Sequence, residues 1–206
     1  MSRKVPEELM KMKYDPSRKL TRGAKRTLYA FSETMFNLLG EKPFDKISVN
    51  ELCQQADYPR ATFYNYFDDK YDLLTYCWYR LRQEVKLDSL SEARSSETFL
   101  QAFAQIYNVF DAHRELLVKV VAHNPLDSPL VFNFTNYFTG VFSDLMAASD
   151  QPKHLKTPVE LVAQHYSATV LLILEWIFLA GHKVTLETAE TYAQELLAPT
   201  TLKALA

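Results

Sequence analysis

Apolar residues recur at helical spacing through the first part of the chain. Between Thr21 and Leu39 they fall every three or four positions, which is the period of one face of an α-helix. Gly40 follows where a helix commonly ends, and Pro43 cannot continue a helix because it lacks the backbone N–H. The pattern predicts a first helix from about residue 21 to residue 39.

A second and a third helix should follow across a tight turn. Ser48 and Glu51 have the S-x-x-E spacing of a capping box, in which each side chain can bond an open backbone N–H at a helix start. This short helix must end near Asp57. Pro59 suits the first position of the next helix, because its fixed φ is already helical. Two short helices joined in this way predict a helix-turn-helix unit, with a longer helix from about residue 69 to residue 81 behind it.

The predicted helix after Pro59 has two chemically different faces. At about 100° per residue, Phe63 and Phe67 project together and can anchor the helix. The other side carries the small, hydroxyl or amide side chains of Ala61, Thr62 and Asn65, and Tyr64 and Tyr66 flank the boundary. Such side chains can approach base edges and phosphates. The alternative is that these residues are only helix caps and solvated surface.

The rest of the chain keeps the helical period. Apolar stripes run from 99 to 110, from 116 to 121 and from 131 to 146, and long helices are expected at about 159–180 and 186–197. The whole sequence of 206 residues holds four glycines, which disfavours strand-and-turn architectures and glycine-rich phosphate loops. We therefore expect an all-α fold.

The predicted helix at 159–180 carries apolar residues on more than one face, and the last predicted helix can cover only part of it. A helix of this kind needs cover on several sides, so we expect the pair to associate with its copies in a second chain as a homodimer. Two-fold symmetry would place two recognition helices about 34 Å apart and demand a near-palindromic operator. The aromatic stripes before them fit either a ligand cavity or an ordinary core.

The net charge of −2 hides an asymmetry. Residues 1–26 hold nine basic and three acidic side chains, a net of +6, and the remainder carries −8. A basic arm ahead of an acidic body indicates a polyanion partner, although a solubilising tail would have the same charge. We expect the basic residues nearest the first helix to bind along the DNA backbone or in the minor groove: Arg18, Lys19, Arg22, Lys25 and Arg26.

Several other classes of protein are disfavoured. Cys53 and Cys77 cannot form a disulfide framework or a four-thiolate zinc site, and they are expected to be small buried hydrophobes in a reducing compartment. The N-terminus has no secretory signal, and the apolar run near residues 170–180 is interrupted by Glu175 and is short for a membrane span. His113 and His123 lie too far apart for ligand spacing, and no hydrolase or phosphate-loop motif occurs. We expect a cytoplasmic protein that has no membrane partner, is not an enzyme and uses no metal or cofactor.

Two stretches resemble a known family. "EKPFDKISVNEL" and "ATFYNYFDDKYDLL" are similar to the DNA-binding domain of TetR-type transcriptional regulators, whose most specific local pattern is T-F/L-Y-x-[YH]-F-x-x-K. The resemblance is dense from Arg26 to Leu74. Further on, "LLILEWIFLAG" at 171–181 resembles the penultimate helix of the dihydroxyacetone-kinase regulator (DhaS-like) branch.

The resemblance implies roles for individual residues. Phosphate contacts would come from Ser48, Thr62, Tyr64 and Lys70, and base contacts from Arg60, Ala61 and Asn65. Lys70 is also expected at a helix N-terminus, where an ammonium and backbone N–H groups together favour a phosphate. The family usually has glycine in the turn where this chain has Asp57. Aspartate tolerates the left-handed region better than most residues, so we expect the turn to survive.

The resulting prediction has three parts. Residues 1–20 form a basic arm, 21–85 a helix-turn-helix domain and 86–206 a helical effector-binding and dimerisation domain. The protein is predicted to be a TetR-type regulator, with repression as the favoured activity, that binds double-stranded DNA as a homodimer. A small-molecule effector could control this binding. The alternative is a TetR-like interaction protein that acts through another regulator and has little operator affinity of its own.

Overall fold

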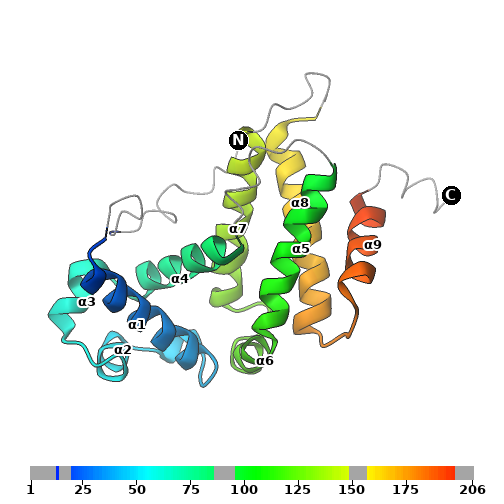
Figure 1. Ribbon diagram of the computed structural model, residues 1–206. Helices are drawn as coiled ribbons and strands as arrows, with labels where there is room; N and C mark the ends of the chain where they lie inside the picture. Colours follow the sequence, from blue (N-terminus) through cyan, green and yellow to red (C-terminus); the bar gives the residue numbers. More distant parts are fainter. Residues whose placement is uncertain (1–12, 14–19, 86–95, 149–156, 198–206) are drawn as a thin grey trace. The chain divides into compact units, whose positions relative to one another are not determined.

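The computed structural model describes residue 13 and residues 20–85, 96–148 and 157–197. Within these ranges all regular secondary structure is helical, so the expected all-α fold is confirmed (Figure 1). The chain divides into two compact units. The first comprises Met1–Leu81 and Val118–Tyr137, and the second comprises Arg82–Leu117 and Phe138–Ala206.

The first unit contains the predicted helix-turn-helix. Its elements in chain order are α1 (Arg22–Leu39), a 3-10 turn η2 (Phe44–Lys46), α2 (Val49–Gln55), α3 (Arg60–Tyr66) and α4 (Lys70–Val85), the last of which runs to the boundary of the unit and beyond. The predicted first helix is confirmed to within one residue, with Thr21 as its N-cap. The Thr21 hydroxyl accepts a hydrogen bond from the Ala24 N–H at 3.1 Å, which satisfies one of the open donors at the helix start.

The predicted capping box of α2 is half formed. The Ser48 hydroxyl accepts from the Glu51 N–H at 3.2 Å, as expected. The Glu51 carboxylate does not return the bond but pairs with the Lys42 ammonium. An ion pair with Lys42 could not be read from the helix pattern, because Lys42 belongs to the preceding loop.

The turn between α2 and α3 reverses the chain through one left-handed residue. Asp57 has φ of 57°, and the Tyr58 N–H bonds to the Cys53 carbonyl at 3.0 Å. This is the Schellman ending of a helix, in which the position after the cap takes the left-handed conformation. The expectation that aspartate can replace glycine here is confirmed. Pro59 has a helical φ of −61° but an extended ψ of 151°, so it is the N-cap and Arg60 is the first helical residue, one position later than predicted.

Aromatic rings fix α3 to α1. Phe63 and Phe67 are fully buried, and both meet Phe31 of α1 edge to face, with centroid distances of 5.3 and 6.1 Å. Tyr58 adds a third ring at 5.5 Å from Phe31. Edge-to-face contacts of this kind add to the stabilisation from buried area. A helix of seven residues is unstable alone, so this cluster is what holds α3 in place.

Residues from further along the chain complete the first unit. They come from the end of α6 (Arg114–His123) and the start of α7 (Pro129–Ala148). The buried Asn124 amide accepts from the Phe44 N–H at 2.8 Å and donates to the Leu39 and Val120 carbonyls at 3.3 and 3.0 Å. Its hydrogen bonds close the loop between α1 and η2.

The second unit packs α5 (Ser96–Ala112), α8 (Val159–Leu174) and α9 (Leu186–Leu197) side by side (Figure 1). Phe178 is buried there and contacts Tyr107 of α5, with ring centroids 5.2 Å apart. The predicted helix at 159–180 has the expected extent, but its last turn, η4 (Glu175–Leu179), is a π turn. Gly181 ends it with φ of 82°, a conformation that side chains with a Cβ rarely adopt.

The apolar stretch Glu160–Leu179 is longer than the sequence pattern indicated. By length and composition alone it could cross a membrane. Core helices of water-soluble proteins pass the same test, so this is weak evidence for a span. Ile173, Ile177 and Phe178 are buried within the unit, and packing against α5 and α9 accounts for their apolar character.

Candidate nucleic-acid interface

The two faces of α3 are separated as the sequence predicts. Arg60, Ala61, Tyr64 and Asn65 are exposed and Thr62 is half-buried, whereas Phe63 is completely buried. The face available to a partner therefore carries a guanidinium, a phenol, an amide and a hydroxyl. These groups can donate to phosphates and to the acceptor edges of bases.

Arg60 is oriented by its neighbour one turn along. Its Nη2 donates to the Tyr64 hydroxyl at 3.2 Å, and the guanidinium carbon lies 5.7 Å from the centroid of the Tyr64 ring. This hydrogen bond to Tyr64 raises the pKa of Arg60 above its usual value, and the group is charged at any physiological pH. A guanidinium has five N–H donors, so the bond to Tyr64 orients it without exhausting its capacity for DNA.

The two predicted hydroxyl ligands lie at helix starts. Ser48 is exposed at the N-cap of α2, and Thr62 occupies the first turn of α3. The Ser48 oxygen accepts a backbone hydrogen bond but keeps its own hydrogen for another acceptor. Capping and phosphate binding are therefore compatible at Ser48.

Lys70 has a different environment from the one expected for a phosphate ligand. Its ammonium donates to the carbonyls of Phe44, Asp45 and Ile47 at 3.0, 3.2 and 3.0 Å, and it lies 4.7 Å from the centroid of the Phe44 ring. A lysine has three N–H donors, and all three are used. The geometry favours a structural role, in which Lys70 holds η2 and the loop that leads to Ser48. Sequence spacing missed this role because the three carbonyls lie more than twenty residues away.

The basic residues at the start of α1 are accessible. Arg22, Lys25 and Arg26 are all exposed in its first turns, as a backbone or minor-groove role requires. Arg18 and Lys19, named with them in the sequence analysis, lie outside the described residues.

Carboxylates surround the junction of α3 and α4. Asp69 caps α4, because its Oδ1 accepts from the N–H groups of Tyr71 and Asp72 at 2.8 and 2.9 Å. Asp72 accepts from the Asp68 N–H at 3.0 Å. Burial raises the pKa of Asp72, and the neighbouring charges of Asp68 and Asp69 act in the same direction. The carboxylates of Asp69 and Asp72 thus have a local structural function.

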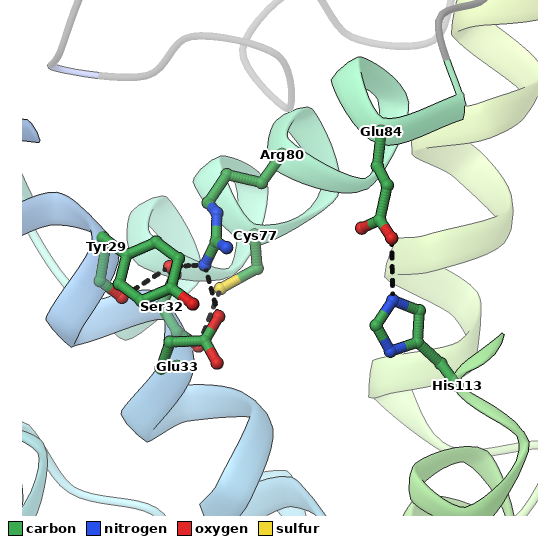
Figure 2. Close-up of polar contacts among 7 residues, drawn as sticks. All are labelled: Tyr29, Ser32, Glu33, Cys77, Arg80, Glu84 and His113. Atoms are coloured by element: carbon green, nitrogen blue, oxygen red, sulfur yellow. Dashed lines mark hydrogen bonds and ion pairs between the residues drawn. The ribbon is translucent and has the colours of Figure 1, made fainter. Parts of the chain in front are cut away.

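A polar cluster joins α4 to α1, as Figure 2 shows. Arg80 donates to the Ser32 hydroxyl, pairs with Glu33 at 2.9 Å and lies 4.4 Å from the Tyr29 ring centroid. Cys77 is fully buried beside them, and burial strongly raises its pKa, so the thiol is protonated and inert. Cys53 is buried as well, so the expected burial of both cysteines is confirmed. Helical periodicity contains no signal for this cluster, because its members lie on two helices far apart in the chain.

The far end of α4 carries a second polar contact. Glu84 pairs with His113 of the turn between α5 and α6 at 3.0 Å, also drawn in Figure 2. In the ranges that the structure describes, no group of three or more histidine, cysteine, aspartate or glutamate residues is placed to hold a metal ion.

Residues 34–77 match the sequence model of the family described as "Bacterial regulatory proteins, tetR family". The helix-turn-helix region is of the TetR type. The match spans all of α2 and α3, residues 34–39 of α1 and residues 70–77 of α4. It therefore includes the helix that carries the exposed face and the turns on either side of it. No curated protein matches the chain in sequence.

Solved structures with the TetR fold extend the likeness over most of the chain. A protein of Syntrophomonas wolfei described as a TetR-family transcriptional regulator is 20% identical with a TM-score of 0.61, covering 85% of this chain and 97% of the other. The fatty acid degradation regulator FadR of Bacillus halodurans is 14% identical with a TM-score of 0.62, covering 88% and 98%. Together with the sequence match, these structures support a TetR-type regulator.

The dihydroxyacetone kinase operon activator DhaS is also among the similar structures. It is 18% identical with a TM-score of 0.52, covering 87% of this chain and 95% of its own. DhaS is one of several TetR-like neighbours, and the two proteins above have higher TM-scores. The assignment to the DhaS-like branch therefore remains a prediction.

Proposed function

We propose that this protein is a TetR-type transcriptional repressor that binds a near-palindromic operator as a homodimer. The observation that carries the proposal is the division of α3, in which Phe63 is buried while Arg60 and Asn65 are exposed. An anchored helix with an exposed polar edge has the form that a major-groove reader requires.

The proposed contacts fall into two classes. Arg60, Ala61 and Asn65 would meet base edges, whereas phosphates would be bound by a wider set: Ser48, Thr62, Tyr64, Arg22, Lys25 and Arg26. Lys70 was predicted to bind a phosphate too. Because its three hydrogens reach backbone carbonyls, we now assign it to support of the loop before Ser48. The division into base and phosphate contacts can be tested by the salt dependence of binding.

The proposed dimer interface lies on the last two helices, α8 and α9. Exposed apolar side chains occur on α8, η4 and α9: Leu161, Leu172, Trp176 and Leu196. The Trp176 ring is stacked on His182, with centroids 3.7 Å apart, and His182 Nδ1 lies 2.7 Å from the Trp176 carbonyl oxygen. Exposed apolar residues on neighbouring helices favour association with another copy.

Control by a small-molecule effector is also part of the proposal. Gln105 of α5 supports it, because its side-chain oxygen is buried and has no hydrogen-bond partner among the described residues. Buried polar atoms are nearly always paired. An effector with an N–H or O–H group would supply the missing donor.

The experiment that tests the proposed function is selection of fragments of the source genome by the purified protein, followed by gel-shift titration of the enriched sequences. We expect enrichment of a near-palindromic site. Failure to retain any duplex in low salt would refute operator binding. If the dimer stayed intact in that case, the result would favour the interaction protein. The exposed acidic side chain of Asp68 beside α3 supports this alternative, because it would repel DNA. Either function requires a cytoplasmic location.

A further inference from the structure

Lys13 of the N-terminal arm contacts the end of α3 and the start of α4. Its ammonium donates to the Tyr64 carbonyl at 2.7 Å and pairs with the Asp68 carboxylate at 3.0 Å. Its backbone N–H faces both oxygens of the Asp72 carboxylate at 3.3 Å. One residue therefore contacts three groups on the helix-turn-helix, more than fifty positions away in the sequence.

The groups that Lys13 contacts are all hydrogen-bond acceptors of negative character: two are carboxylates, and the third is a backbone carbonyl with a partial negative charge. Tyr64 belongs to the last turn of α3, where the carbonyls lack helical partners and carry the negative end of the helix dipole. Asp68 adds a full charge, and its side chain is 73% exposed. Left alone, these groups would repel DNA phosphates that approach α3.

The backbone contact distinguishes this arrangement from a simple surface ion pair. Isolated exposed pairs contribute little, because two long side chains must be held in place. Here the main chain of residue 13 is bound as well as its side chain, and the Asp72 carboxylate also accepts from the Asp68 N–H. Lys13 and Asp68 are therefore joined twice, once directly and once through Asp72.

We propose that Lys13 is a positioning residue of the DNA-binding unit, which docks the N-terminal arm on the C-terminal end of α3 and neutralises Asp68. The proposal rests on the proposed DNA-binding function. It assigns Lys13 no phosphate of its own, in contrast to Arg22, Lys25 and Arg26 at the start of α1.

The first test compares two lysines of the arm in operator binding by the full-length protein. Lys13→Met and Lys11→Met remove the same charge. We expect Lys13→Met to weaken binding about two- to fivefold more than Lys11→Met, since an exposed pair and a helix end each contribute modestly. Lys13→Arg should retain most of the affinity. The slope of log affinity against log salt should stay at the wild-type value in Lys13→Met, because no phosphate contact is lost.

A double-mutant cycle identifies the partner. In an Asp68→Asn background the further change Lys13→Met should have less than about half its effect on log affinity, because the charge to be neutralised is gone. Asp69→Asn is the matched control, because Asp69 caps α4 and asparagine caps equally well. Equal affinities of Lys13→Met and Lys11→Met, or a full effect of Lys13→Met beside Asp68→Asn, would overturn the positioning role.

A test without DNA separates docking from the proposed function. Trypsin must take the Lys13 side chain into its own pocket, so docking should slow cleavage after Lys13. We expect Asp68→Asn to accelerate this cleavage and Asp69→Asn to leave it unchanged, as followed by mass spectrometry of the products. Equal rates in the two variants would overturn docking. If the wild-type protein retained no DNA while this difference persisted, operator binding would fail and the docking of Lys13 would stand.

Discussion

At the residue scale, the exposed edge of α3 combines groups for base edges with groups for phosphates. Arg60 bonds Tyr64 on the same face, and Asn65 projects beside them without burial. An asparagine amide can donate to and accept from adenine at the same time, whereas a phenol bonded to a phosphate reads no base. Truncation of Asn65 should therefore change the base preference of the protein, whereas truncation of Tyr64 should mainly lower its affinity for DNA.

Asn65→Ala should relax the preference at one base pair of the operator, by about 1–3 kcal/mol if the amide makes a bidentate contact. Tyr64→Ala should weaken operator binding substantially, because a phosphate contact and the hydrogen bond that orients Arg60 are both lost, and it should leave the dimer intact. Gel-shift titration against the operator and its single-base variants measures both effects. An equal loss on every sequence for Asn65→Ala would reassign Asn65 to a phosphate or structural role.

The turn between α2 and α3 requires a left-handed backbone conformation at Asp57. Its left-handed φ of 57° costs an ordinary side chain about 1–2 kcal/mol, and glycine pays no such penalty. Asp57→Gly should raise the free energy of unfolding by a few tenths to about 1 kcal/mol, and Asp57→Val should lower it by about 1 kcal/mol or more. Thermal unfolding measures both changes.

Ala56 supplies the control for this prediction. It precedes Asp57 and has a right-handed φ of −75°, so Ala56→Gly should lower stability through the added freedom of the unfolded chain. If Asp57→Gly were as destabilising as Ala56→Gly, the left-handed conformation would not be the feature that limits this turn.

At the scale of elements, contacts distant in sequence hold the short helices. Lys70 at the start of α4 binds the carbonyl of Phe44, and Asn124 after α6 binds its N–H. The 3-10 turn η2 is therefore fixed from two sides. Since η2 leads directly to Ser48 and α2, the side chains of Lys70 and Asn124 set the position at which the helix-turn-helix begins.

Asn124→Ala should lower the free energy of unfolding by about 1–3 kcal/mol, because the buried Phe44 N–H would lose its acceptor. Asn37→Ala is the matched control. Asn37 is exposed on α1 of the same unit, and its loss should change stability by less than about 0.5 kcal/mol. Chemical denaturation measures the free energy of unfolding of both variants. Equal losses would mean that the buried hydrogen bonds of Asn124 stabilise the fold no more than the exposed side chain of Asn37 does.

At the scale of the whole molecule, the proposed two-fold symmetry depends on α8 and α9. Leu172 is 58% exposed on α8, although it lies within the apolar run at residues 170–174. Leu172→Asp should convert the dimer to monomers at micromolar concentration, since a charge would be buried in the interface without a partner. It should cost the isolated chain little. Sedimentation measures the assembly state.

Leu126→Asp tests whether the effect depends on location. Leu126 is 41% exposed in the first unit and lies outside the proposed interface. The variant should sediment as the wild-type protein does. Wild-type protein that sedimented as a monomer would refute the homodimer directly.

The sequence was most informative where local rules act alone. Helical periodicity located α1, the S-x-x-E spacing located the start of α2, and the alternation around Phe63 separated the buried and exposed faces of α3. These features follow from spacing along one helix, so they need no knowledge of distant residues. The left-handed Asp57 was expected on a different ground, because the TetR-type pattern has glycine at this turn and aspartate tolerates the left-handed region.

Other features were decided by the tertiary structure, because they join residues far apart in the chain. The three carbonyls around Lys70, the amide of Asn124 and the contacts of Lys13 with Tyr64 and Asp68 depend on which segments fold together. The partner of a charged or amide side chain depends on which residues lie near it in space. Helical periodicity shows only on which face of its helix the side chain lies. The sequence by itself determined the helices and the exposed edge of α3, and the tertiary structure decided which polar side chains were left for a nucleic acid and which were used to hold the protein together.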